Sequence, residues 1–185
     1  MRLKRGFNTD LETVKRFLDV LGSSAVVLGS SNFGRPGFFI YAHGFIHDYI
    51  EMVFLRKEEL LIDALKTCGF PTDDGPIGFV RSDQEKIKTA AVALLAAAQH
   101  WQAGDDNARS EVAWSVSQFT STFRQHLERL KNLIFPLLEQ NLTLEDEHRI
   151  AERLNTIVFE VEPEGEPDRF TKMIETLEEE LRDWY

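Results

Sequence analysis

Histidine and glutamate residues at helical spacing are the side chains of this sequence that could do chemistry. His43, His47 and Glu51 follow one another at intervals of four. Residues four apart lie one above the other on a helix face, so His47 and Glu51 have the spacing of two ligands to one metal ion. The alternative is that these side chains make only a local ion pair or hydrogen bond.

Glu58, Glu59 and His126 form a second set of possible ligands, supplied by two distant segments. His126 lies among apolar residues, where a histidine is more often a core residue satisfied by one hydrogen bond than a ligand. Glu58 and Glu59 could equally be solvated or paired with Arg and Lys. The sequence leaves both interpretations open.

We find no other catalytic pattern. Gly29, Gly34 and Gly37 do not fit a phosphate-binding loop, and no Gly-x-Ser-x-Gly motif is present. Cys68 is the only cysteine, which excludes an intrachain disulfide and a cysteine-based metal site. It lies at a predicted helix end without an evident base. We therefore expect no catalytic residues and no enzymatic activity.

Helices are predicted to position these residues. The first should run from Leu11 to Leu21, with Gly22 ending it and residues 23–37 forming a buried crossover loop or a short strand. The second should span 38–67, and the third should begin at a Ser82–Glu85 capping box and reach Trp101. The fourth is expected over 108–140 with Pro136 kinking or ending its last turn.

Two further helices are predicted after this group. Thr143 should cap a fifth helix of about fifteen residues. Residues 160–168 contain Pro and Gly and should form a loop before a sixth helix that closes the chain.

Apolar residues at spacings of three and four predict two seams of a helical bundle. The first seam comprises Val80, Gln84, Ile87, Ala91, Leu94 and Ala98. The second comprises Val116, Phe119, Phe123, His126, Leu130, Leu133 and Leu137. Long amphipathic helices with short connections favour an antiparallel bundle, so the predicted fold class is all-α.

Four motifs in order give a family resemblance. These are the stretch from Phe45 to Lys57-Glu58-Glu59-Leu60-Leu61, the segment Gly75-Pro76-Ile77, the run from His126 to Pro136, and a C-terminal tail with Leu144, Asp146, Glu160, Gly165, Phe170 and Leu181. Together they resemble the hemerythrin-like (HHE cation-binding) domain family. The resemblance implies one domain over 1–185: an antiparallel four-helix bundle over about 8–140 and a C-terminal helical extension over about 141–185.

The resemblance also implies positions for the family's iron ligands, and most of them are occupied by other residues. Leu11 lies at the first histidine position, Phe54 and Leu55 at the paired histidines, and Gln84 at the third-helix histidine. The fourth-helix His-x-x-x-Glu keeps His126 but has Leu130, with Lys131 beside it. Only His126 and Glu58, or Glu59, remain, so we expect a degenerate site closed into a packed core.

A displaced mononuclear site is the alternative position for a metal. His47 lies seven residues before Phe54, which is about 10 Å along a helix axis. His126 should lie level with Phe54, so His47 and His126 should not share one ion. At the level of His47 the third helix should present the region of Ala91, whose seam has no carboxylate or histidine.

Composition limits the partners. The chain has 185 residues and a formal net charge of −10, which argues against nucleic acid and anionic membranes as ligands. No apolar run approaches the length of a membrane span. The basic start at 1–5 is followed by polar residues rather than an export signal, so we expect a cytoplasmic protein.

We therefore predict a binding or regulatory protein for an unidentified protein or small molecule, with no cofactor expected. The alternative is an iron-binding protein that responds to oxygen, nitric oxide or iron stress. It would need His43, His47, Glu51, Glu58 and His126 brought together by a different register. A homodimer is a third hypothesis, with contacts from Trp101, Trp114, Trp184 and Tyr185.

Overall fold

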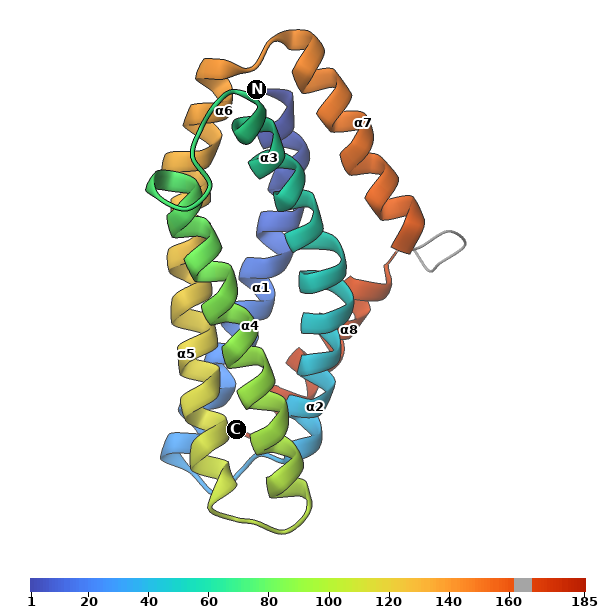
Figure 1. The fold of residues 1–185 in the computed structure, drawn as a ribbon. Helices are drawn as coiled ribbons and strands as arrows, with labels where there is room; N and C mark the ends of the chain where they lie inside the picture. Colours follow the sequence, from blue (N-terminus) through green and yellow to red (C-terminus); the bar gives the residue numbers. More distant parts are fainter. Residues whose placement is uncertain (162–167) are drawn as a thin grey trace.

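The computed structural model describes residues 1–161 and 168–185. All of the regular structure in this part of the chain is helical. The bundle consists of long helical segments that lie side by side, which we call rods, and each is made of one to three consecutive helices. Helix α7 (Leu144–Val161) runs obliquely along the outside of these rods (Figure 1). The all-α bundle predicted from the sequence is confirmed. One continuous cluster of buried apolar residues joins the rods.

The first rod is α1 (Arg2–Ser30), which is much longer than predicted. The helix begins at Arg2 and passes through Gly22, so the predicted stop and the crossover loop over 23–30 are wrong. Buried residues continue at helical spacing beyond Gly22, through Ser24 to Val27 and Leu28. This packing outweighs a cost of about 1 kcal/mol for a glycine inside a helix.

The second rod contains α2 (Pro36–Phe45), η1 (Ile46–Leu55) and α3 (Arg56–Thr67). Its extent agrees with the predicted helix over 38–67. The middle ten residues, however, are wound as a π-helix, with hydrogen bonds five residues apart instead of four. The sequence analysis did not anticipate this change of winding.

The π-helix explains an unusual burial pattern in the second rod. Core residues recur at intervals of four, and each is fully buried: Ile46, Ile50, Phe54, Glu58 and Ile62. In an α-helix, a step of four residues turns about 40° past a full circle, so such a row would drift around the rod. The wider π turn reduces this drift and keeps the row facing the core.

The third rod is α4 (Gly75–Gln102), and it starts earlier than predicted. Pro76 occupies the first turn, where its missing N–H and fixed φ suit a helix start. Ser82 therefore lies inside the helix, and the predicted capping box is wrong. All six residues of the predicted seam on this helix are buried, which confirms that seam.

The fourth rod contains α5 (Ala108–Arg129), η2 (Leu130–Ile134) and α6 (Phe135–Asn141). Pro136 lies in the first turn of α6, so it marks the end of the π segment and not a kink in a last turn. The seam is as predicted up to Leu130. Beyond it, Leu133 and Leu137 are only half-buried, and Ile134 and Leu138 face the core instead. The π turn of η2 moves the seam by one residue.

The C-terminal part contains α7 and α8 (Arg169–Arg182). Oγ1 of Thr143 accepts the backbone N–H of Asp146 at 3.1 Å, which confirms the predicted cap of the fifth helix. α7 packs against α1 and α3, and α8 packs against α1 and α2. Of the predicted loop over 160–168, the first two residues belong to α7, and 162–167 lie outside the described residues. No helix in the described ranges is long and apolar enough to cross a membrane.

Candidate functional site

His126 and Glu58 meet in the centre of the bundle. Nε2 of His126 lies 2.7 Å from Oε2 of Glu58, and both side chains are 0% exposed. Glu58 lies three residues after the end of η1, and His126 lies four residues before the start of η2, so each residue is about one turn from a π segment. The structure thus brings together the two candidate ligands that the resemblance left in place. Glu59, the other candidate, is half-buried and lies 3.4 Å from Arg81 instead.

Gln84 completes the surroundings of Glu58. Its Nε2 donates a hydrogen bond of 2.7 Å to Oε1 of Glu58. Both carboxylate oxygens of Glu58 therefore have a donor from another helix, one on α4 and one on α5. A carboxylate buried in this way is satisfied by protein groups alone.

Asp83 and Arg129 extend the network toward the surface. Oδ2 of Asp83 lies 3.6 Å from Nδ1 of His126, which allows an ion pair but is too long for a hydrogen bond. Accordingly, neither atom has a hydrogen-bond partner in the described part of the chain. Oδ1 of Asp83 accepts a 2.6 Å bond from Nη1 of the partly exposed Arg129.

Asp83 and Arg129 were not among the site residues predicted from the sequence. A signal was present, because Asp83 lies four residues before the seam residue Ile87, and Arg129 lies three after His126. A charged residue at a core-facing position with an opposite charge on the neighbouring helix indicates a buried pair.

The electrostatics of the network favour a charged imidazole. Burial lowers the pKa of His126, but the nearby carboxylates of Glu58 and Asp83 outweigh it and raise the pKa to about 9. Burial likewise raises the pKa of Asp83, and the contacts with His126 and Arg129 outweigh it, so the pKa lies below its usual range. The carboxylates of Glu58 and Asp83 and the cations of His126 and Arg129 therefore balance one another, with Arg129 at the partly exposed end of the network.

Aromatic side chains pack around the pair. The ring of Phe54 lies 5.3 Å from Phe7 and 5.8 Å from Phe123, and Phe123 lies 5.7 Å from the imidazole of His126. Leu130 is also fully buried. Leu11 is half-buried at the core edge, beside the fully buried Phe7 one turn earlier. Apolar groups thus occupy most of the positions at which the resemblance places metal ligands, and the polar Gln84 occupies another.

His43, His47 and Glu51 do not join this site. His47 is exposed, and its Nδ1 lies 2.9 Å from Oδ1 of Asp48. Asp48 in turn pairs with Arg169 on α8. His43 and Glu51 are half-buried on the same rod. His47 thus makes a local contact, as in the alternative to a metal site, but with Asp48 and not with Glu51. Its exposed position also places it away from His126.

The donor set can be tested against the two irons that the family resemblance implies. In the described ranges, no three His, Cys, Asp or Glu side chains gather where they could hold one metal ion. Glu58 approaches Nε2 of His126 and Asp83 approaches Nδ1, so one ion could not be bound by His126 and both carboxylates together. A di-iron centre in a bundle needs several converging histidines and carboxylates. The residues present do not fit one.

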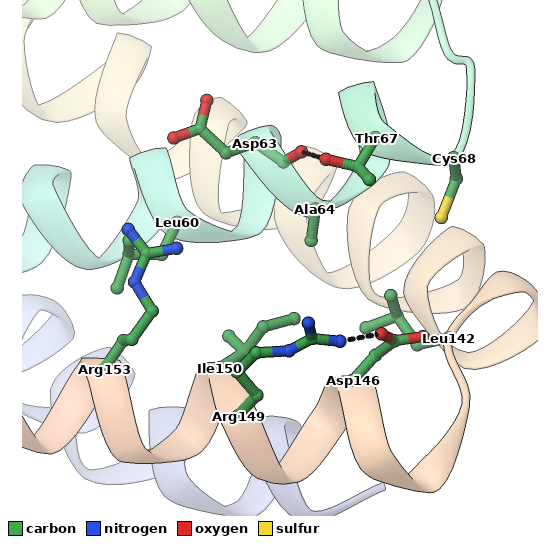
Figure 2. Close-up of a pocket in the computed structure, with 10 residues that line it drawn as sticks. All are labelled: Leu60, Asp63, Ala64, Thr67, Cys68, Leu142, Asp146, Arg149, Ile150 and Arg153. Atoms are coloured by element: carbon green, nitrogen blue, oxygen red, sulfur yellow. Dashed lines mark hydrogen bonds and ion pairs between the residues drawn. The ribbon is translucent and has the colours of Figure 1, made fainter.

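A hollow lies on the outside of the bundle, between α3 and α7. It has a volume of about 210 Å³ and an apolar floor that includes Leu60 and Ile150 (Figure 2). Arg149 on its wall pairs with Asp146. Cys68 at its edge is exposed, and its Sγ lies 3.9 Å from the carbonyl oxygen of Asn141. Its two arginines and two aspartates balance, so the hollow selects no ligand charge.

The aromatic residues considered as dimer contacts differ in position. Trp114 and Tyr185 are exposed. Trp184 is buried at one end of the core, 4.7 Å from the ring of Phe38, and Trp101 is half-buried beneath Arg109. Trp184 and Trp101 therefore cover core ends, which leaves Trp114 and Tyr185 as the outward-facing pair.

Comparison with known proteins gives one family. A family model described as "Hemerythrin HHE cation binding domain" matches residues 9–138. The match covers most of the four rods and ends in α6, so α7 and α8 lie beyond it. Searches of curated proteins and of solved structures found no match.

Proposed function

Because the chain belongs to the hemerythrin HHE cation-binding family, we propose that it is a binding or regulatory protein that keeps the family's bundle without its di-iron, oxygen-binding centre. One observation carries this proposal: Nε2 of His126 is engaged with Oε2 of Glu58 at 2.7 Å, in a core where both side chains are fully buried.

The protonation state of His126 supports the proposal. A histidine ligates a metal through the lone pair of a neutral imidazole nitrogen. Here the pKa of His126 is raised to about 9, so the imidazole carries both protons at neutral pH. Nε2 then donates its proton to Glu58, and a metal would have to displace that proton together with the ion pair.

The chemistry of the surroundings supports a role that is not catalytic. The buried polar groups of the network are joined to one another through Gln84, Glu58, His126, Asp83 and Arg129. They are packed among aromatic rings, and none is a nucleophile with an activating base. Cys68 is free and exposed, which supports a reducing cytoplasm as the place of action.

Metal content tests the proposal directly. Untagged protein expressed with added iron should hold less than about half an iron per chain by mass spectrometry, because two donors form a weak site. Its visible spectrum should lack an oxo-bridged charge-transfer band. Close to two irons per chain together with that band would overturn the proposal.

The iron-binding alternative is favoured by one feature: an imidazole and a carboxylate, the two ligand types of iron, lie in direct contact. It would require the His126–Glu58 pair to open and other donors to join it. Iron that is lost on the substitution His126→Gln, but kept on His47→Gln, would establish this alternative.

A further inference from the structure

A second buried polar group lies between α1 and the second rod. Asp10, Lys57 and Tyr49 are 6%, 8% and 7% exposed. Nζ of Lys57 lies 3.0 and 2.9 Å from the two carboxylate oxygens of Asp10, and the hydroxyl of Tyr49 donates to Oδ1 at 2.7 Å. We refer to Asp10, Lys57 and Tyr49 as the buried trio.

The trio leaves one donor available. A lysine ammonium has three N–H groups, and Asp10 is the only acceptor of Lys57 among the described residues. Two carboxylate oxygens engage two of these N–H groups. Asp10 itself accepts bonds from Lys57 and from Tyr49. The third N–H of Lys57 is therefore free to donate to a ligand, whereas the carboxylate of Asp10 already accepts from Lys57 and Tyr49.

All three members of the trio line a cavity of about 290 Å³. This volume lies just below the range of about 300–1,000 Å³ for ligand pockets, so the cavity suits a small ligand. Apolar side chains provide much of the remaining wall: Val53, Val158, Val161 and Phe170. An apolar cavity with a few fixed polar groups is the usual form of a small-molecule site.

The winding of η1 helps to build this cavity. Tyr49, Val53 and Lys57 line it at intervals of four, and the neighbouring row of the same rod, one residue further along, presents Glu58 to His126. In an α-helix these residues would drift around the rod, as described for the buried row from Ile46 to Ile62. The wider π turn reduces that drift. π-helical segments occur frequently at functional sites.

The cavity also depends on the C-terminal helices. Val158 and Val161 come from α7, and Phe170 comes from α8, both of which lie outside the family match. The rings of Phe170 and Tyr49 are 4.8 Å apart, so the wall contributed by α8 is in contact with the trio.

We propose that this cavity binds a small molecule with an apolar body and one carbonyl or carboxylate oxygen. The oxygen accepts the free N–H of Lys57, and the apolar body packs on Val53, Val158 and Phe170. Asp10 pairs with Lys57 and fixes the direction of its side chain. A cationic ligand is disfavoured because Lys57 and Tyr49 already occupy Asp10. This inference names a ligand class for the proposed binding role and rests on that role.

Ligand-observed NMR tests the ligand class with four probes: benzoate, isovalerate, benzamide and benzylamine. We expect saturation transfer to benzoate, isovalerate or benzamide, and none to benzylamine. Benzoate or isovalerate alone identifies a carboxylate, whereas benzamide alone identifies a neutral carbonyl. Transfer to benzylamine alone, or to none of the probes, would overturn the proposal.

Two glycines of α1 offer a matched pair of variants. A Cβ added at Gly6, which lines the cavity, or at Gly29, which does not, meets nothing within 4 Å. Both Gly6→Leu and Gly29→Leu should therefore fold. Gly6→Leu should weaken probe binding by more than about tenfold, and Gly29→Leu should leave it unchanged. Equal binding to both variants would place the probe elsewhere and overturn the proposal.

Lys57→Met tests the anchor, because it removes the donors and keeps an unbranched apolar side chain. Binding of the oxygen-containing probes should be lost. If this variant fails to fold with Asp10 unpaired, the glycine pair still decides the question. Iron content measured on the same preparations separates the two proposals, since an iron-free protein that binds no probe fails only the present one.

Discussion

Glu58 and His126 are 68 residues apart in the chain and meet through a single 2.7 Å hydrogen bond at the centre of the bundle. Each comes from a rod that changes from α to π winding next to it. The pair joins the second and fourth rods, and Gln84 adds the third. A polar contact thus lies where apolar side chains would otherwise join the rods.

Removing one charge of the pair should destabilise the protein strongly. Glu58→Gln leaves the imidazolium of His126 without its nearest carboxylate, and breaking a buried pair in this way costs about 3–5 kcal/mol. Urea unfolding measures the loss. Glu59→Gln is the control, because Glu59 is only half-buried and its contact with Arg81 is long, at 3.4 Å. This substitution should change stability by less than about 0.5 kcal/mol. Similar losses in both variants would contradict the assignment.

Stability should fall as the solution becomes alkaline. The pKa of His126 is raised to about 9 in the folded protein, above its unfolded value of about 6.5, so folding takes up a proton between these values. The contribution is fully present below about pH 6.5 and is lost as the pH rises through about 9, on the order of 3 kcal/mol.

Urea unfolding at several pH values between 6 and 10 measures this slope. His126→Gln should flatten it. His47→Gln should leave it in place, because His47 is exposed and pairs locally with Asp48. A wild-type protein equally stable at pH 6.5 and pH 9.5 would show that His126 is neutral in the core.

Restoring ligands should restore metal binding. Phe54→His, Gln84→His and Leu130→Glu in one chain place three donors around His126 and Glu58, at buried positions. Without metal this variant should unfold more easily, because Leu130→Glu buries a carboxylate. Added Fe²⁺ or Zn²⁺ should then raise its melting temperature and bind at about one ion or more per chain. Leu133→Glu in place of Leu130→Glu is the control, because Leu133 is only half-buried.

The π turn in the fourth rod should be able to lose its extra residue without a change of core contacts. Deleting the exposed Lys131 leaves Ile134 three positions after Leu130 and Leu138 four positions after Ile134, which is the spacing of an α-helical seam. Both side chains should stay in the core, so we expect a loss of less than about 1 kcal/mol by urea unfolding. Deleting Asp106 in the loop between α4 and α5 should be tolerated equally well. A loss of about 3 kcal/mol or more for the Lys131 deletion alone would mean that the packing needs the π winding itself.

The fold was predictable because its seams are long and regular. Six positions of α4 and the first five of the α5 seam have the expected burial, and Gln84 stands out as the polar residue among them. The end of α1 was not predictable from local signals, because Gly22 is a typical stop that tertiary packing overrides.

The site was predictable only in part. His126 and Glu58 were identified as remaining candidates, but their direct contact depends on how η1 and η2 set the register of two rods. The strict interval of four from Ile46 to Ile62 is a sequence signal for the wider turn that we did not use. Lys57 was interpreted only as part of a motif, although it pairs with Asp10.

The position of α7 and α8 determines when the cavity can form during synthesis. Arg16 on α1 pairs with Glu178 on α8, 162 residues later in the chain. At about 5–20 residues per second, the ribosome needs several seconds to add everything that follows α6. The four rods are thus translated while the buried trio still faces water. Ligand binding then becomes possible only once α8 has been added, so the ligand should bind chains that include α8 and not shorter nascent ones.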